Sequence, residues 1–387
     1  MVTLSLVSML VAAALGEAAV RVICGGKFGP RPAFIVGDNH LGWKPAPNLD
    51  DTFYGPDYEI DIRTDADGYR LGALGDVDYT KDLVVLCGDS YAFGWGVSTN
   101  QTFASYLDQL LDQESSARAR VVNLGVGGYG MLQSCDRLEE FFKNHPSAHV
   151  RTVLVQHCVN DPADNSRSVG YHVGMWETQN RSKPRSRLHL VNLIAYASLM
   201  TGQNRRSQVD VQMNHPYLQD MLESYERKGR WVHYPEQAVI GNQQIKFDVA
   251  NLKHDVKPED LLARGQLSRM QSDLMFASLG CIHEACAARG VTVVHTFIST
   301  TPDWYVQEVT KLALDSAKLE QCRAVATGRV PRPEAYGGAI TNDHSGGHFN
   351  GEYNRFWAKA VADVLRDVAS PEADPMPGVD STGAVHR

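Results

Sequence analysis

The feature that most constrains the fold is a serine that comes directly after an apolar run of strand length. The run Leu83–Cys87 contains no turn residue and predicts a buried β-strand. Gly88 and Asp89 break this run, Ser90 follows the break, and residues 102–111 have helical spacing. Ser90 therefore lies on a loop between a strand and a helix, where open α/β sheets hold their reacting groups.

The pattern around Ser90 excludes one familiar arrangement. The nucleophile turn of α/β-hydrolases has the pattern G-x-S-x-G. Gly88 stands two residues before Ser90, but Ala92 stands two residues after it, so the pattern is absent.

Short apolar runs and amphipathic stretches alternate from residue 83 onward. Further strands are expected at 121–124, 152–157 and 291–297. Helices are expected at 102–112, from the end of the loop at 125–130 to about residue 142, at 262–289 and at 349–368. Such alternation indicates an α/β protein with a parallel sheet and helices on both faces, a three-layer α/β/α sandwich.

Composition limits the possible partners and cofactors. The chain has 387 residues, of which 43% are hydrophobic, so a large core is expected. A net charge of -8 gives no electrostatic reason to bind nucleic acid. The seven cysteines have no metal-ligand spacing, so we expect no metal site and no cofactor.

The N-terminal residues form an apolar run for which several interpretations are open. Residues 1–16 contain no charged side chain, and Glu17 and Arg21 follow one helical turn apart. The run is shorter than the roughly 20 residues of a bilayer span. Ala14-Leu15-Gly16 would suit signal cleavage, but a positive n-region is missing. A cleaved signal, an uncleaved anchor reaching Ile23 and a buried helix are the alternatives, and export or anchoring is favoured for residues 1–24.

The rest of the chain divides into four parts. Residues 25–80 are a lead-in that packs on the main domain, with a loop at 42–48, a strand at Tyr58–Arg63 and a return strand starting at Tyr69. The main domain covers 81–368 and carries a large insertion at about 165–258, which includes a helix at Leu188–Thr201. Residues 369–387 are rich in Pro, Gly, Asp and Ser and are expected to be disordered.

Four polar stretches fit together as one site. They are Gly88-Asp89-Ser90, the loop from Asn123 to Gly128, Val159-Asn160-Asp161, and the stretch from Asp343 to Asn350. The first three each follow an expected strand, so a parallel sheet would bring them to one edge. Taken singly, Ser90 could be a helix N-cap, Gly128 a turn residue and Asn160 an Asx turn.

These residue types suit acyl transfer. A serine hydroxyl needs a base within hydrogen-bond reach, and histidine can take its proton and return it to the leaving group. A carboxylate holds the imidazole tautomer, and amide donors stabilise the oxyanion.

The four stretches resemble the sequence blocks of the SGNH family of GDSL-type hydrolases. Gly88-Asp89-Ser90-Tyr91 is similar to the first block, with Tyr91 in place of the usual Leu. The loop ending at Gly128 is similar to the second block, Cys158-Val159-Asn160-Asp161 to the third with Cys158 replacing Gly, and His348-Phe349-Asn350 to the last. The resemblance covers residues 83–164 and 291–368, and it implies the flavodoxin-like sandwich already expected.

The resemblance implies a role for each site residue. Ser90 would be the nucleophile and His348 the base, while the backbone N–H groups of Ser90 and Gly128 and the side chain of Asn160 would form the oxyanion hole. The family places its Asp two or three residues before the His, where this chain has Ser345 and Gly346. Asp343, five before His348, is the candidate third member, and His344 is a second candidate base.

The expected function is hydrolysis of acyl esters, with short acyl or acetyl groups, through an acyl-enzyme on Ser90. The substrate would be an acylated carbohydrate or lipid. An O-acyltransferase acting on an extracytoplasmic polysaccharide and a non-catalytic binding protein are the alternatives. Membrane-associated bacterial members have a similar lead-in, from Gly42 to Arg70. We therefore expect an anchored or secreted protein with an extracytoplasmic catalytic domain, attached to the membrane, if anchored, through residues 1–23.

Overall fold

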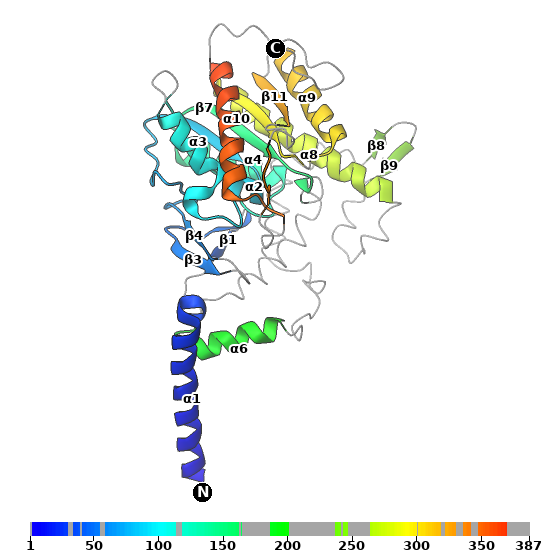
Figure 1. Cartoon of the computed structure of the whole chain (residues 1–387). Coiled ribbons are helices and arrows are strands. Elements are labelled where there is room, and N and C mark those ends of the chain that lie inside the picture. The colour runs from blue at the N-terminus through cyan, green and yellow to red at the C-terminus, as the bar shows by residue number, and fades with distance from the viewer. Residues whose placement is uncertain are drawn as a thin grey trace.

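The chain starts with a long helix and continues through two small β-hairpins into an α/β domain, as the computed structural model shows (Figure 1). The structure describes residues 2–29, 34–38, 41–54, 59–113, 118–161, 164, 186–200, 237–240, 243–246, 264–299, 301–318, 322–329, 336–341 and 347–369.

A parallel sheet forms the centre of the α/β domain. Its strands are β5 (Asp82–Cys87), β6 (Arg120–Asn123), β7 (His149–His157), β10 (Thr292–Phe297) and β11 (Ala324–Arg329). Their spatial order is β11-β10-β7-β5-β6, and each neighbouring pair is parallel. The carboxyl ends of β6, β5 and β7 therefore lie side by side.

Helices cover both faces of this sheet, which confirms the α/β/α sandwich (Figure 1). Leu83, Val85 and Cys87 of β5 point to the face covered by α4 (Met131–Asn144), α8 (Arg264–Ala287) and α9 (Asp303–Lys318). Val84 and Leu86 point to the opposite face, which is covered by α3 (Phe103–Asp112) and α10 (Gly351–Ala369). This alternation is the two-residue period of a strand buried on both sides.

Two elements of the sandwich were not expected from the sequence. Strand β11 lies at the sheet edge, and its small side chains from Val325 to Thr327 are only half buried. It therefore lacks the apolar run by which a central strand is recognised. Helix α9 follows Pro302 and buries Tyr305, Val309 and Ala313 against the sheet.

The lead-in contains two antiparallel hairpins. Strand β1 (Ile35–Asp38) pairs with β2 (Gly42–Pro45), and β3 (Asp50–Tyr54) pairs with β4 (Glu59–Arg63). The expected loop at 42–45 is thus a strand. The expected return strand at Tyr69 is also wrong, because β4 takes its partner from the preceding residues and Arg70 forms only single bridges to Thr64 and Asn123.

Arg70 ties the lead-in to the α/β domain. Its guanidinium is buried and donates hydrogen bonds to the carbonyls of Phe93 (3.0 Å), Gly94 (2.7 Å) and Val97 (2.7 Å). Burial lowers the pKa of Arg70 to about 9. The lead-in therefore holds the loop that follows the Ser90 turn.

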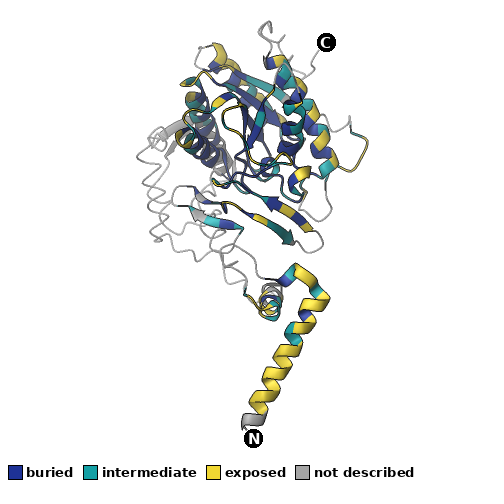
Figure 2. Cartoon of the chain, turned by 90° about the vertical axis from the view of Figure 1, so that its left-hand side faces the viewer, coloured by how far each residue is buried: buried dark blue, intermediate teal, exposed yellow. Residues whose placement is uncertain are grey.

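The N-terminal helix α1 (Val2–Cys24) extends away from the domain, and most of its surface is exposed (Figure 2). The most apolar stretch within Ser5–Phe28 has a mean hydropathy of 1.9, and only 6% of it is buried. Among the alternatives for this segment, a helix buried in the core is therefore wrong. Its length and composition suit a signal sequence or a membrane anchor.

The insertion is described only in part. Helix α6 (His189–Met200) agrees with the helix expected at Leu188–Thr201, and β8 (Gln237–Ile240) pairs with β9 (Gln243–Lys246). The remainder of the insertion and the tail beyond Ala369 lie outside the described residues.

A chain of buried polar side chains runs between the sheet and the helices α8 and α9. His157 is hydrogen-bonded to His295 (Nε2 to Nδ1, 2.9 Å), and His295 to His283 (Nε2 to Nε2, 2.8 Å). His283 Nδ1 lies 2.9 Å from Ser316 Oγ, and His157 Nδ1 lies 2.9 Å from the Tyr305 hydroxyl. All five side chains are buried, so each ring nitrogen requires one of these partners.

Two of the histidines are held neutral. Burial lowers the pKa of His283 to about 4 and that of His295 well below its ordinary value. A neutral imidazole has one donor and one acceptor nitrogen. The hydroxyl of Tyr305 donates to Asp161, so it can only accept from His157 Nδ1. One arrangement satisfies every contact of the chain, with each donor pointing from Ser316 towards Tyr305.

These depressed pKa values predict a fold that weakens in acid. Above pH 6.5 both rings are neutral in the folded and unfolded chains. As the pH falls from 6.5 towards 4, these two histidines become protonated in the unfolded chain but stay neutral in the folded protein. The free energy of unfolding should therefore fall by up to about 1.4 kcal/mol per pH unit for each histidine. His283→Gln should reduce this slope, measured by denaturant unfolding of the full chain in detergent at several pH values.

The matched control is Ser316→Ala, which removes a partner of the same ring but no titrating group. It should lower stability and leave the slope in place. An equal loss of slope in both variants would contradict the assignment of the slope to His283.

Candidate functional site

The turn that carries Ser90 is built around a glycine. Strand β5 ends at Cys87, and Ser90 opens the short helix α2 (Ser90–Phe93). Gly88 between them has φ +153°, and a Cβ there would lie 2.9 Å from both Ala92 Cβ and Gln156 Oε1. The close turn therefore requires glycine. The Asp89 side chain caps α2 by accepting a hydrogen bond from the backbone N–H of Tyr91 (2.9 Å).

Ser90 and His348 are in direct contact although 258 residues separate them. His348 Nε2 lies 2.7 Å from Ser90 Oγ, and His348 comes three residues before the first residue of α10. Both side chains are half buried. This is the hydrogen-bond distance that proton transfer from a serine to a histidine requires.

Tyr91 contacts His348 with its ring and the preceding residue with its hydroxyl. Its ring centroid lies 4.8 Å from that of His348, and its hydroxyl donates to the carbonyl of Gly347 (3.2 Å). Burial raises the pKa of Tyr91 to about 12, so the hydroxyl keeps its proton. From the sequence, Tyr91 was only a departure from the usual Leu, and this contact was not foreseen.

The loop after β6 lies against the Ser90 turn. Val126 N–H donates to the carbonyl of Gly88 (3.2 Å), and a Cβ on Gly127 would lie 3.7 Å from Ser90 Cβ. A Cβ on Gly125 would approach the backbone N of Phe93 to 2.6 Å, so the two loops touch through glycine. Gly128 has φ +81°. Tyr129, the next residue, is fully buried and donates to the carbonyl of Trp43.

Asn160 reaches the same edge from the end of β7. Its amide nitrogen donates to Asp89 Oδ2 (3.1 Å) and to Asp164 Oδ2 (2.6 Å). Asp89 Oδ2 also lies 3.2 Å from Ser90 Oγ. The ends of β5, β6 and β7 thus bring Ser90, the Gly128 loop and Asn160 together.

A buried cluster lies beneath these residues. Cys158 Sγ is 3.1 Å from Asp89 Oδ2 and 2.9 Å from both Asn160 Oδ1 and Asp161 Oδ1. Asp161 Oδ2 accepts from the Cys158 backbone N–H (2.9 Å) and from the hydroxyl of Tyr305 (2.7 Å). The histidine chain therefore ends on the turn that carries Asn160.

Burial sets the protonation of this cluster. It raises the pKa of Asp89, with a further contribution from the Asp161 carboxylate. It also raises the pKa of the Cys158 thiol and of the Tyr305 hydroxyl. The ligand atoms of Asp89, Cys158 and Asp161 lie within 4.8 Å of one another, close enough to share a cation. Because metal ligation needs a thiolate and the thiol is favoured here, the cluster suits hydrogen bonding better.

Two sequence candidates lie beyond this geometry. Asp343 and His344 fall in residues 342–346, outside the described part of the chain. Conversely, the contacts of Asp89 with Asn160 and Cys158 were missed, as were those of Asp161 and Tyr305. No local pattern indicates which side chains meet across three strands and a helix.

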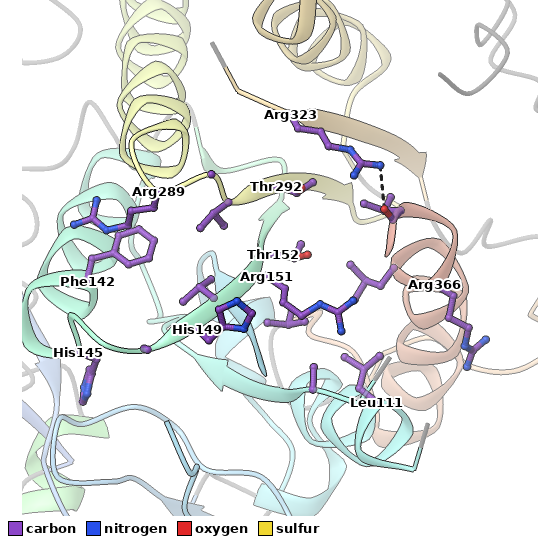
Figure 3. A pocket seen from close by; sticks show the side chains of 18 of the residues that line it. Leu111, Phe142, His145, His149, Arg151, Thr152, Arg289, Thr292, Arg323 and Arg366 are labelled. Carbon is purple, nitrogen blue, oxygen red and sulfur yellow. Dashed lines mark hydrogen bonds between the residues drawn. The ribbon is translucent and has the colours of Figure 1, made fainter. Parts of the chain in front are cut away.

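A separate cavity lies at the opposite edge of the sheet. Residues near the amino ends of the strands line it, including Val84, Thr152 and Thr292. Its rim carries the basic side chains of Arg151, Arg289, Arg323 and Arg366 (Figure 3). The cavity contains none of the site residues, so the chemistry described above lies elsewhere.

Comparison with known proteins identifies a family for this chain. The sequence model of the GDSL-like Lipase/Acylhydrolase family matches residues 86–377. No curated protein matches the sequence.

Two solved structures show distant similarity. An acetyl xylan esterase (Est2A) from the rumen bacterium Butyrivibrio proteoclasticus is 10% identical with a TM-score of 0.35. That match covers 76% of this chain, which spans 65% of the esterase. LAE5, an alpha/beta hydrolase enzyme from the metagenome of Lake Arreo, Spain, is 15% identical with a TM-score of 0.18, over 52% of this chain and 96% of that one.

The family model covers about three quarters of the sequence, including the turn of Ser90, the turn of Asn160 and the loop of His348. The chain therefore belongs to the GDSL-like Lipase/Acylhydrolase family.

Proposed function

We propose that the protein hydrolyses acyl esters by nucleophilic catalysis, with Ser90 as nucleophile and His348 as general base. The observation that carries this proposal is the 2.7 Å contact between His348 Nε2 and Ser90 Oγ. A non-catalytic binding protein would have no need of this contact.

The reaction would proceed in two steps. Ser90 Oγ attacks the ester carbonyl carbon while His348 takes the hydroxyl proton, and the resulting tetrahedral intermediate expels the alcohol as His348 returns the proton to its oxygen. Water then attacks the acyl-enzyme, His348 takes a proton from it, and Ser90 leaves with that proton as the acid is released.

The oxyanion would be bound by the backbone N–H groups of Ser90 and Gly128 and by the amide of Asn160. Asn160 Nδ2 has two hydrogens, and both now point to carboxyl groups of Asp89 and Asp164. One of them would turn to the oxyanion as negative charge develops.

We propose Asp343 as the residue that orients His348, because it is the nearest carboxylate before His348 in the sequence. Gly347 has φ +89°, a conformation that allows the chain before His348 to turn sharply. Such a turn would offset the longer spacing of five residues.

We also propose that α1 anchors the catalytic domain to a membrane, on its extracytoplasmic side. Its exposed apolar surface and its length support this function. The substrate would then be an acylated carbohydrate or lipid at that membrane, with a short acyl group.

Replacing the nucleophile tests the central proposal. Ser90→Ala in the full chain should lower kcat/KM for a chromogenic acetyl ester by about 10⁴-fold or more. Ser98→Ala, in the loop before α3, is the matched control and should retain activity. Equal activity of Ser90→Ala and wild type would refute a nucleophilic role for Ser90.

Replacing the proposed orienting carboxylate tests the third member of the triad. Asp343→Asn should lower kcat by about 10⁴-fold, because the wrong histidine tautomer would face Ser90. His344→Gln is the neighbouring control and should leave kcat within a few-fold. If instead His344→Gln abolishes turnover and Asp343→Asn does not, the assignment of both residues is wrong.

Tyr305 should affect turnover although it touches no substrate. Tyr305→Phe removes the hydroxyl that donates to Asp161, so the Asn160 turn loses support that matters most when the oxyanion forms. We expect kcat to fall about tenfold with little change in KM. Tyr79→Phe removes a similar Tyr–Asp hydrogen bond, to Asp65 at 3.1 Å, far from the site. A kcat loss of the same size in this control would show that only general stability is affected.

A further inference from the structure

Helix α6 belongs to the insertion, yet it is fastened to the N-terminal helix. In Figure 1 it lies nearly at right angles to α1, and after a quarter turn it is seen end-on beside α1 in Figure 2. The two views agree that α6 crosses α1 near the carboxyl end of α1.

Glu17 makes the main connection between the two helices. Its carboxylate accepts hydrogen bonds from the backbone N–H groups of His189 (2.9 Å) and Leu190 (2.8 Å), and from Arg21 Nε (2.7 Å). It therefore caps the first turn of α6, where orphan N–H groups favour an anion. The one acidic side chain of α1 is thus neutralised within the contact.

Two further contacts hold α6 in place. A Cβ on Gly16 would lie 3.2 Å from Leu190 Cδ2, so the glycine allows the helices to approach closely. Asn192 Nδ2 donates to the carbonyls of Phe28 (2.6 Å) and Ser186 (2.8 Å). The orientation of α6 is therefore determined by α1 and the turn that follows it.

The outer surface of α6 is apolar. Leu188, Val191 and Ile194 are 49%, 47% and 60% exposed, and residues 188–200 contain no Asp, Glu, Lys or Arg. A continuous apolar surface of this kind marks a contact with a membrane or a protein. On α1 it continues into exposed side chains such as Leu10 and Leu15, which are 70% and 67% exposed.

The geometry of α1 indicates which contact this is. Residues 2–16 of α1 would span about 22 Å, less than the roughly 30 Å of a hydrocarbon core. We place Glu17 and Arg21 at the boundary of that core. Helix α6 is capped by Glu17 and crosses α1, so it then lies in the plane of the membrane interface. Monotopic helices take this position, with the apolar side chains among the acyl chains.

We propose that α6 is a second membrane-contacting element, which lies in the plane of the bilayer and presents Val191 and Ile194 to the lipids of the membrane that α1 enters. This inference rests on the proposed anchoring by α1 and is independent of the proposed chemistry at Ser90. The partner is a phospholipid bilayer, and α6 fixes the orientation of the protein on it.

Site-specific photocrosslinking tests the proposal directly. The full chain would be reconstituted into phosphatidylcholine–phosphatidylglycerol liposomes with p-benzoylphenylalanine at position 191 or 194, irradiated and analysed by mass spectrometry. We expect lipid adducts at both positions. The matched control is position 314 on α9, where Leu314 is 53% exposed, and it should give no lipid adduct above background. Esterase activity of each labelled protein verifies that it is folded.

A label at position 10 separates the two proposals. Lipid adducts at position 10 without adducts at 191 and 194 would leave the anchor intact and overturn the role of α6. Crosslinks from 191 or 194 to a second protein chain would do the same and assign the surface to a protein contact. Absence of lipid adducts at all three positions would overturn the anchor, and the role of α6 with it.

Discussion

The buried carboxyl group of Asp89 connects the parts of the site. It caps the helix of Ser90, lies 3.2 Å from the Ser90 hydroxyl, and accepts a hydrogen bond from the amide of Asn160 at 3.1 Å. Ser90 follows β5 and Asn160 follows β7, so Asp89 joins the two strand ends that carry the proposed nucleophile and a proposed oxyanion donor. An error of about 1 Å in such an alignment costs about a hundredfold in rate. The proposed mechanism therefore depends on the hydrogen bonds of Asp89.

A carboxyl group buried in this way requires support, since its burial without partners would cost several kcal/mol. Cys158, Asn160 and Tyr91 supply donors to Asp89 directly. Tyr305 and Cys158 supply donors to Asp161, and the three histidines form the chain that ends on the Tyr305 hydroxyl. These histidines come from β7, β10 and α8, so the network also fixes the distance between the sheet and that helix. Stability of the core and placement of Asn160 thus depend on the same hydrogen bonds.

The sequence was sufficient to predict the sandwich and to place Ser90, Asn160 and the Gly128 loop at one edge of the sheet. In a parallel sheet the carboxyl ends of all strands lie at the same edge, so this prediction hardly depends on the order of the strands. It also predicted His348, which lies in contact with Ser90. Edge strand β11 escaped prediction because a half-buried strand needs no apolar run. The roles of Tyr91 and Tyr305 escaped because each depends on a partner more than 140 residues away. Cys158 stands where the family block has glycine, and its thiol is the centre of the buried cluster, a role that the sequence did not predict.

The proposed membrane anchor and the proposed active site lie in different parts of the molecule, and the fold determines how they are placed. Figure 1 shows α10 with its first turns on the side of the domain that faces α1 and its last turns on the far side. Ser90 and His348 lie near the beginning of α10, so the proposed active site lies on the side of the domain that faces the anchor. The arginine-rimmed cavity lies at the far edge. A rigid anchor made of α1 and α6 would then limit the substrates that reach Ser90 to esters held near the membrane surface. Selection by position can replace a deep specificity pocket, because a substrate confined near the site needs little binding energy of its own.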